Sequence, residues 1–121
     1  MTEPERRAQV RLTAGAERDL AGIYRRRLAQ RGAGGADGAD ALLERIVAAI
    51  EGLADYPLRG PVPPELEALG IRRYRQMSLA PFRLIYLPEP NEAPESVTVM
   101  IVADSRRDFL TLLEERLLRR G

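Results

Sequence analysis

The sequence has 121 residues, of which 45% are hydrophobic and 31% are charged, and its formal net charge is +1. This length predicts a single domain over residues 1–121 that can bury one hydrophobic core without disulfides or metals. No apolar run approaches the ~18 residues that a membrane-spanning helix needs, and no apolar stretch follows the charged N-terminus as in a secretory signal. We therefore expect a cytoplasmic protein that does not engage a membrane.

Missing residue types narrow the chemistry. The sequence has no cysteine and no histidine, and all 19 of its cationic side chains are arginine. These absences exclude cysteine and histidine metal sites and catalysis by a thiolate, an imidazole or a lysine amine. Arginine stays protonated, so it stabilises anions but hardly transfers protons. The spacing of the acidic residues does not resemble a metal site, and we expect neither a metal nor another cofactor.

The first half of the chain predicts a strand and a helical hairpin. Residues 1–8 are expected to form a flexible tail and residues 10–12 a short strand. Thr13 is a candidate N-cap for a helix that carries an apolar stripe at helical spacing. That stripe consists of Ala16, Leu20, Ile23, Tyr24 and Leu28.

A glycine-rich break at 32–38 follows this helix. Because it follows a helix rather than a strand, we interpret it as a turn and not as a nucleotide-binding loop. Asp37 or Asp40 is expected to cap a second helix, which Pro57 stops. Its apolar face consists of Leu42, Ile46, Ala49, Ile50 and Leu53, and the two helices are predicted to pair antiparallel.

The second half predicts a Pro-rich connector at 57–70 and three strands at 71–79, 82–87 and 97–102, with an acidic loop at 88–96. A last helix follows Asp108, with apolar residues at Phe109, Leu112, Leu113, Leu117 and Leu118. The predicted order is β-α-α-β-β-β-α. It is typical of an α+β two-layer fold in which the hairpin packs on an antiparallel meander and the other sheet face stays partly open.

Arginine is concentrated on the predicted sheet. Residues 71–87 hold four arginines and no acid, and two more arginines follow the third strand. The six are Arg72, Arg73, Arg75, Arg83, Arg106 and Arg107. Period-2 alternation places Arg73 and Arg75 on one face, with Arg72 and Tyr74 on the other. Two interpretations stay open: one surface that binds anionic ligands, or a solvated face whose cations pair with nearby acids.

Two further features have alternative interpretations. Tyr74, Phe82 and Tyr86 are interleaved with these arginines, as on surfaces that bind single-stranded RNA, or they pack in the core. The last helix either packs on its own domain or offers its apolar face to a partner segment. The carboxylates form no recognisable acid–base pair and the serines lack a histidine, so the residues favour binding over catalysis.

Four ordered stretches resemble the RelE/ParE superfamily of toxins from type II toxin–antitoxin systems. They are LTAGAERDLAGIYRRRL, LLERIVAAIEGLADYPLRGPVPPEL, IRRYRQMSLAPFRLIYL and VADSRRDFLTLLEERLL, which together cover roughly residues 10–119. The resemblance implies a plasmid-stabilising toxin that a cognate antitoxin with an acidic tail neutralises in a hetero-oligomer.

Toxins of this superfamily divide in activity. RelE-like members cut mRNA on the ribosome without a metal, whereas ParE-like members inhibit DNA gyrase. Arg83 and Arg106 match arginines of the RelE-like site, but its lysines are absent, and Leu112 lies where a RelE-like tyrosine would fall. We therefore favour the ParE-like branch, with a ribosome-dependent nuclease or a non-toxic binding module as alternatives. The partner surfaces are predicted at the six arginines named above and at Phe109, Leu112 and Leu113.

Overall fold

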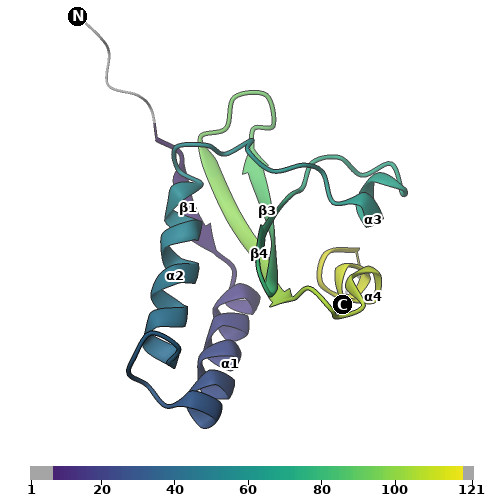
Figure 1. Cartoon of the computed structure of the whole chain (residues 1–121). Coiled ribbons are helices and arrows are strands. Elements are labelled where there is room, and N and C mark those ends of the chain that lie inside the picture. Colours follow the sequence, from purple (N-terminus) through teal and green to yellow (C-terminus); the bar gives the residue numbers. More distant parts are fainter. Residues whose placement is uncertain (1–6, 119–121) are drawn as a thin grey trace, which may run out of the picture.

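The protein has a four-stranded sheet with helices on both faces (Figure 1). The structure is a computed structural model that describes residues 7–118. Strands β2 (Arg75–Leu79), β3 (Phe82–Glu89) and β4 (Ser96–Asp104) form the predicted antiparallel meander. Strand β1 (Gln9–Leu12) pairs in parallel with β4, so the order across the sheet is β1-β4-β3-β2. The α+β class and the predicted element order are confirmed, with one short helix added between α2 and β2.

Helices α1 (Ala14–Arg31) and α2 (Ala39–Gly52) form the predicted hairpin. Thr13 caps α1 as expected, because its Oγ1 accepts a hydrogen bond from the Ala16 amide at 3.0 Å. Gly32 ends α1 with a φ of +73°, a left-handed conformation that glycine adopts without a Cβ clash. The predicted cap of α2 is wrong: Gly38 holds that position and no side chain caps the helix.

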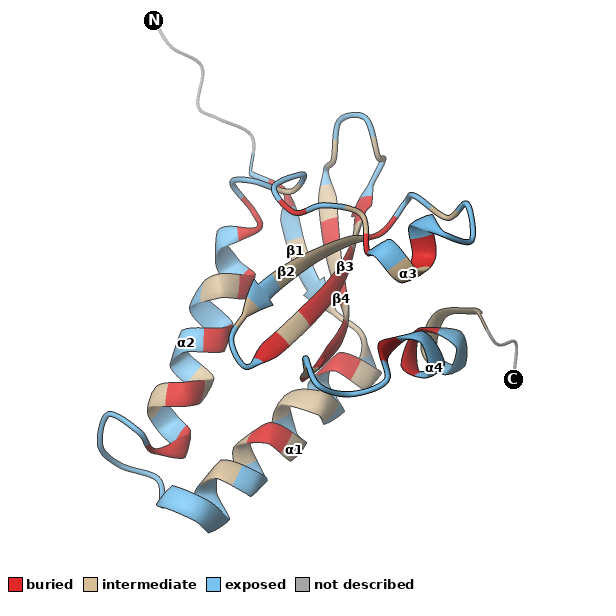
Figure 2. Ribbon diagram, turned by 45° about the vertical axis from the view of Figure 1, so that its right-hand side comes forward, coloured by how far each residue is buried: buried red, intermediate tan, exposed pale blue. Residues whose placement is uncertain are grey.

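The hairpin covers one face of the sheet with apolar side chains. The helical spacing predicted most of this packing, but Leu28, in the last turn of α1, is 41% exposed. Figure 2 shows exposed residues at this end of α1, which extends beyond the sheet. This first core consists of Ala8, Ala16, Ile23, Leu42, Ile46, Ile50, Leu53, Phe82, Leu84, Tyr86, Val97, Val99 and Val102.

The opposite face is also covered, which contradicts the expectation that it stays partly open. Helix α3 (Pro64–Glu67) and helix α4 (Phe109–Leu113), which continues as the π-helical segment η1 (Glu114–Leu118), lie over it (Figures 1 and 2). The second core consists of Leu66, Tyr74, Ile85, Ile101, Ala103, Phe109, Leu112 and Leu113. The fold therefore buries both sheet faces, one under a long hairpin and one under short helices.

A β-bulge in β4 reverses the alternation of its side chains between the two cores. The register to β3 shifts between Ile85 and Tyr86, whose partners are Ile101 and Val99, so Met100 is the extra residue. Val99 therefore packs in the first core and both Met100 and Ile101 in the second. The Met100 carbonyl, outside the regular ladder, accepts hydrogen bonds from Arg116 at 2.9 Å and from the Thr13 hydroxyl at 3.4 Å.

Several predicted boundaries move. Ala8 is buried and its amide donates to the Ala54 carbonyl at 2.9 Å, so the predicted tail does not include it. The part of that tail at 1–6 lies outside the described residues. Helix α2 ends at Gly52, before Pro57, and β2 begins at Arg75 rather than at 71. The predicted connector at 57–70 contains α3, because a proline at the first turn suits a helix start.

Candidate partner-binding surfaces

The arginines of the predicted sheet surface do not share one face. Arg72 forms an ion pair with Glu67 at 2.6 Å, and the Arg73 guanidinium lies 5.1 Å from the Tyr74 ring centroid. Tyr74, Phe82 and Tyr86 are all buried, so the alternative of an RNA-stacking surface is wrong and these rings pack in the cores. The single surface of guanidinium groups that the sequence allowed is therefore not formed.

Arg75 braces the connector that precedes α3. Its Nη1 donates to the Gly60 carbonyl at 3.0 Å, and the Gly60 amide donates to the hydroxyl oxygen of buried Tyr86 at 2.9 Å. Burial raises the pKa of the Tyr86 phenol. A Cβ at Gly60 would lie 1.8 Å from the Gln76 carbonyl oxygen, so only glycine fits. Arg75 thus has a structural role on the face opposite to Arg83.

Arg83 lies beneath the C-terminal helix. Its Nη1 and Nη2 donate to the two carboxylate oxygens of Glu65 at 2.8 and 2.9 Å, and Nη2 also donates to Gln76. The guanidinium stacks 4.1 Å from the centroid of the Phe109 ring, and only 14% of the side chain is exposed. Hydrogen bonding from Arg83 lowers the pKa of Glu65, which keeps that carboxylate ionised. The terminal nitrogens of Arg83 are therefore already occupied within the fold.

Arg106 lies on the other side of the sheet end. Its Nε and Nη2 donate to the two oxygens of Asp104 at 2.9 and 2.8 Å, and its backbone amide adds a third bond to Asp104. These bonds lower the pKa of Asp104 to about 2. Arg107 is exposed, and its amide donates to the Asp104 carbonyl at 3.1 Å.

The three apolar residues predicted at a partner surface are core residues. Phe109, Leu112 and Leu113 are buried under α4 against the second sheet face. Arg116 fixes this helix from its far end, since its Nη1 and Nη2 donate to the Asp19 carboxylate of α1, each at 3.1 Å. The expectation of an exposed apolar helix face at these positions is wrong, because this face of α4 packs against the sheet of the same chain.

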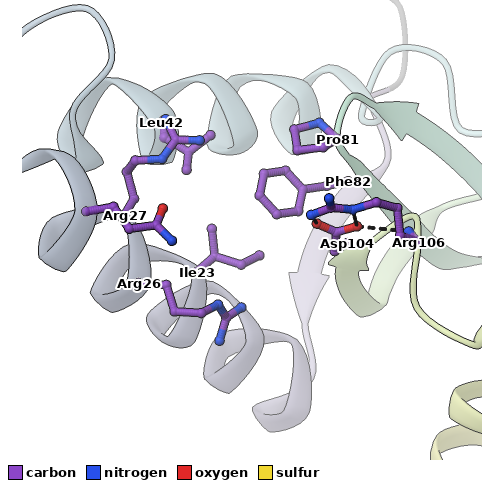
Figure 3. Close-up of a pocket in the computed structure, with 9 residues that line it drawn as sticks. Ile23, Arg26, Arg27, Leu42, Pro81, Phe82, Asp104 and Arg106 are labelled. Carbon is purple, nitrogen blue, oxygen red and sulfur yellow. Dashed lines mark hydrogen bonds and ion pairs between the residues drawn. The ribbon is translucent and has the colours of Figure 1, made fainter.

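The structure also forms a cleft that the sequence analysis missed. It lies between α1 and the sheet end, and its volume is about 270 Å³ (Figure 3). One sequence feature could have revealed this cleft. The spacing along α1 places four of its lining residues on one helix face: Ile23, Arg26, Arg27 and Gln30. The other lining residues are Leu42, Pro81, Phe82, Asp104 and Arg106.

Two negative findings hold for the described part of the chain. Within residues 7–118 no helix is long and apolar enough to cross a membrane. The same residues contain no group of three or more acidic side chains that could hold a metal ion.

Comparisons with known proteins agree with this architecture. The profile of one family, described as ParE toxin of type II toxin-antitoxin system, parDE, matches residues 10–109. A chain of the chromosomal ParDE system from P. aeruginosa superposes with a TM-score of 0.62 and 17% identity, over 83% of this chain and 98% of that one.

A chain of the toxin–antitoxin complex RelBE2 from Mycobacterium tuberculosis superposes with a TM-score of 0.56 and 21% identity, over 88% of this chain and 100% of that one. No curated protein sequence matches. The two structural likenesses concern the fold, whereas the family profile covers most of the sequence. The chain therefore belongs to the family of ParE toxins of type II toxin–antitoxin systems.

Proposed function

We propose that this chain is a toxin that a cognate antitoxin neutralises in a hetero-oligomer, and that it acts by binding DNA gyrase rather than by cutting RNA. The proposal includes a cytoplasmic site of action and a role in plasmid stabilisation. Family membership supports the toxin role, and the two similar structures described above come from toxin–antitoxin systems.

One observation carries the preference for binding over cleavage: Arg83 and Arg106 do not converge. Arg83 contacts Phe109 on the face covered by α4, while Arg106 lines the cleft beside Ile23 and Phe82 of the first core. RNA cleavage needs a base for the 2′-hydroxyl, an acid for the leaving oxygen and cations on the phosphate, all within reach of one another. Two arginines on opposite faces, each bonded to its own carboxylate, do not meet that requirement.

The groups near Arg83 also argue against proton transfer. Both oxygens of Glu65 accept hydrogen bonds from Arg83, and the lowered pKa of Glu65 makes it a poor base. Leu112, at the position of a RelE-like tyrosine, is a buried apolar side chain. The residues around Arg83 therefore have structural contacts and include no suitable proton-transfer group.

A gyrase supercoiling assay with the purified chain tests the proposal. We expect the unsubstituted chain to inhibit supercoiling at stoichiometric excess, and the protein encoded by the neighbouring reading frame to relieve the inhibition when added first. Unaffected gyrase, together with codon-phased transcript cuts that Arg83→Ala and Arg106→Ala abolish in folded protein, would overturn it in favour of a ribosome-dependent nuclease. Harmless expression in cells without that neighbour would instead indicate a binding module without toxicity.

A further inference from the structure

The cleft is a preformed indentation at the edge of the main core. Ile23, Leu42 and Phe82, which form its floor, are 4%, 5% and 8% exposed and all belong to that core. Figure 3 shows Ile23 and Phe82 facing the middle of the cleft, with the Asp104–Arg106 pair at its rim. Because packed core residues hold the floor in place, the cleft does not depend on a partner for its shape.

The rim of the cleft has an excess of positive charge. Arg106 is neutralised by Asp104, and Arg27 reaches away to Asp37 in the hairpin loop, with its Nη1 3.2 Å from Oδ1. Arg26 is exposed and forms no ion pair within residues 7–118, although its charge, after the stronger contribution of Arg106, also helps to lower the pKa of Asp104. One guanidinium beside an apolar floor therefore remains available to an anion.

Size and lining restrict the ligand. The volume of about 270 Å³ is below the ~300–1,000 Å³ of pockets for drug-sized ligands, so it suits one or two side chains. The floor of aliphatic and aromatic carbon favours an apolar side chain over a ribose-phosphate, and the exposed guanidinium of Arg26 at the rim can bind a carboxylate. An amphipathic helix presents both together when an acid follows an apolar residue by three or four positions.

We propose that this cleft receives an apolar side chain of the antitoxin, and that Arg26 binds a carboxylate one helical turn away on the same antitoxin segment. The identity of the partner rests on the proposed function. The site itself is defined by α1, Pro81, Phe82 and the Asp104–Arg106 pair.

A single label in the cleft tests whether it is occupied. The chain has no cysteine, so Gln30→Cys, at an exposed lining position, gives one attachment site for an environment-sensitive fluorophore. Adding the protein encoded by the neighbouring reading frame should shift the emission of this label to the blue. A matched label at Ala48→Cys, an exposed position of α2 outside the cleft lining, should change less.

A charge reversal tests the role of Arg26. Arg26→Glu should weaken the dissociation constant of that partner by about tenfold or more, because it replaces an attractive charge pair with a repulsive one. Arg25→Glu makes the same charge change at an exposed neighbour that does not line the cleft, and should weaken binding by no more than about threefold through the general field. Thermal melts of both variants check that the fold is intact.

The outcomes separate the two proposals. One outcome would contradict binding in the cleft and leave the proposed function unaffected. In it, the partner binds tightly, the label at position 30 does not respond, and Arg26→Glu and Arg25→Glu weaken binding equally. No binding by the unsubstituted chain would contradict the proposed function and this inference with it. A response at position 30 to a single-stranded RNA oligonucleotide but not to the protein would assign the cleft to nucleic acid and overturn the proposal.

Discussion

The two faces of the sheet are closed by different physical means. On the first face, two helices of 18 and 14 residues bury a continuous apolar stripe. On the second face, the short helices α3 and α4 bury a smaller apolar cluster, and two ion pairs add to their attachment. Arg83–Glu65 ties α3 to β3, and Arg116–Asp19 ties η1 to α1. The first face is therefore held by a large hydrophobic core, and the second by a smaller hydrophobic core together with two ion pairs.

The largest loss of stability is expected when a buried side chain of the helical hairpin is truncated. Ile46 is fully buried in α2, so Ile46→Ala should lower the free energy of unfolding by about 2–5 kcal/mol. Val47, the next residue and 37% exposed, provides the control: Val47→Ala should cost less than about 1 kcal/mol. Urea denaturation of both variants measures the difference. Equal losses would show that α2 does not face the sheet as described.

An intermediate loss of stability is expected when the ion pair between Arg116 of η1 and Asp19 of α1 is removed. Arg116→Met keeps the aliphatic stem but leaves Asp19 with only the Val102 amide, which donates to it at 3.0 Å. The loss should be about 1–3 kcal/mol, the usual cost of an unsatisfied polar group in a partly buried site. Hydrogen exchange should quicken at the amides of α4 more than at those of α2, because the two faces open separately.

Arg106→Met is the control for this substitution, because the Arg106 side chain is 85% exposed and solvent screens its pair with Asp104, so the loss of stability should be much smaller than in Arg116→Met. Uniform acceleration of exchange across α2 and α4 in Arg116→Met would mean that both faces unfold as one unit. That result would remove the distinction between them.

The smallest effect is expected in the pH dependence of the Arg83–Glu65 pair. Hydrogen bonding from Arg83 lowers the pKa of Glu65 below its ordinary value of 4.5, so the folded state favours the ionised form. Stability from this shift is present above pH 4.5 and is lost as the pH falls through the lowered folded value. The Tm difference between the unsubstituted chain and Glu65→Gln should therefore be constant between pH 7 and about 5 and shrink on further acidification. A difference that grows on acidification would contradict the assigned direction.

Local patterns in the sequence predicted the parts of the fold that depend on nearest neighbours. Thr13 is a helix cap because its hydroxyl needs only the amide three residues on, and the stripe of α2 follows from helical geometry alone. The prediction that Asp37 caps α2 is wrong for a tertiary reason. This residue has capping chemistry, yet its carboxylate pairs with Arg27 and Arg31 across the hairpin. Tertiary partners thus overrode the local preference.

The arginines show where a strand pattern stops being informative. Alternation was applied to residues 72–75, of which only Arg75 lies in β2. This pattern could not show that Glu65, 18 residues before Arg83 in a Pro-rich connector, reaches Arg83. Nor could it show that α4 lies over that face, since an apolar helix stripe has the same pattern whether it meets its own sheet or a partner. The cleft at Arg26 was missed for a related reason: its walls come from segments some 80 residues apart.

The sequence by itself determined the element order, the helical hairpin, the meander and the family to which the chain belongs, because periodicity and ordered motifs are properties of contiguous residues. Only the tertiary structure decided which arginines remain available. An ion pair depends on two side chains meeting in space, and Arg83 and Arg106 meet their carboxylates on opposite faces of the sheet while Arg26 is left at the rim of a cleft. The choice between a surface that binds and a site that cuts therefore depends on distances that no spacing along the chain specifies.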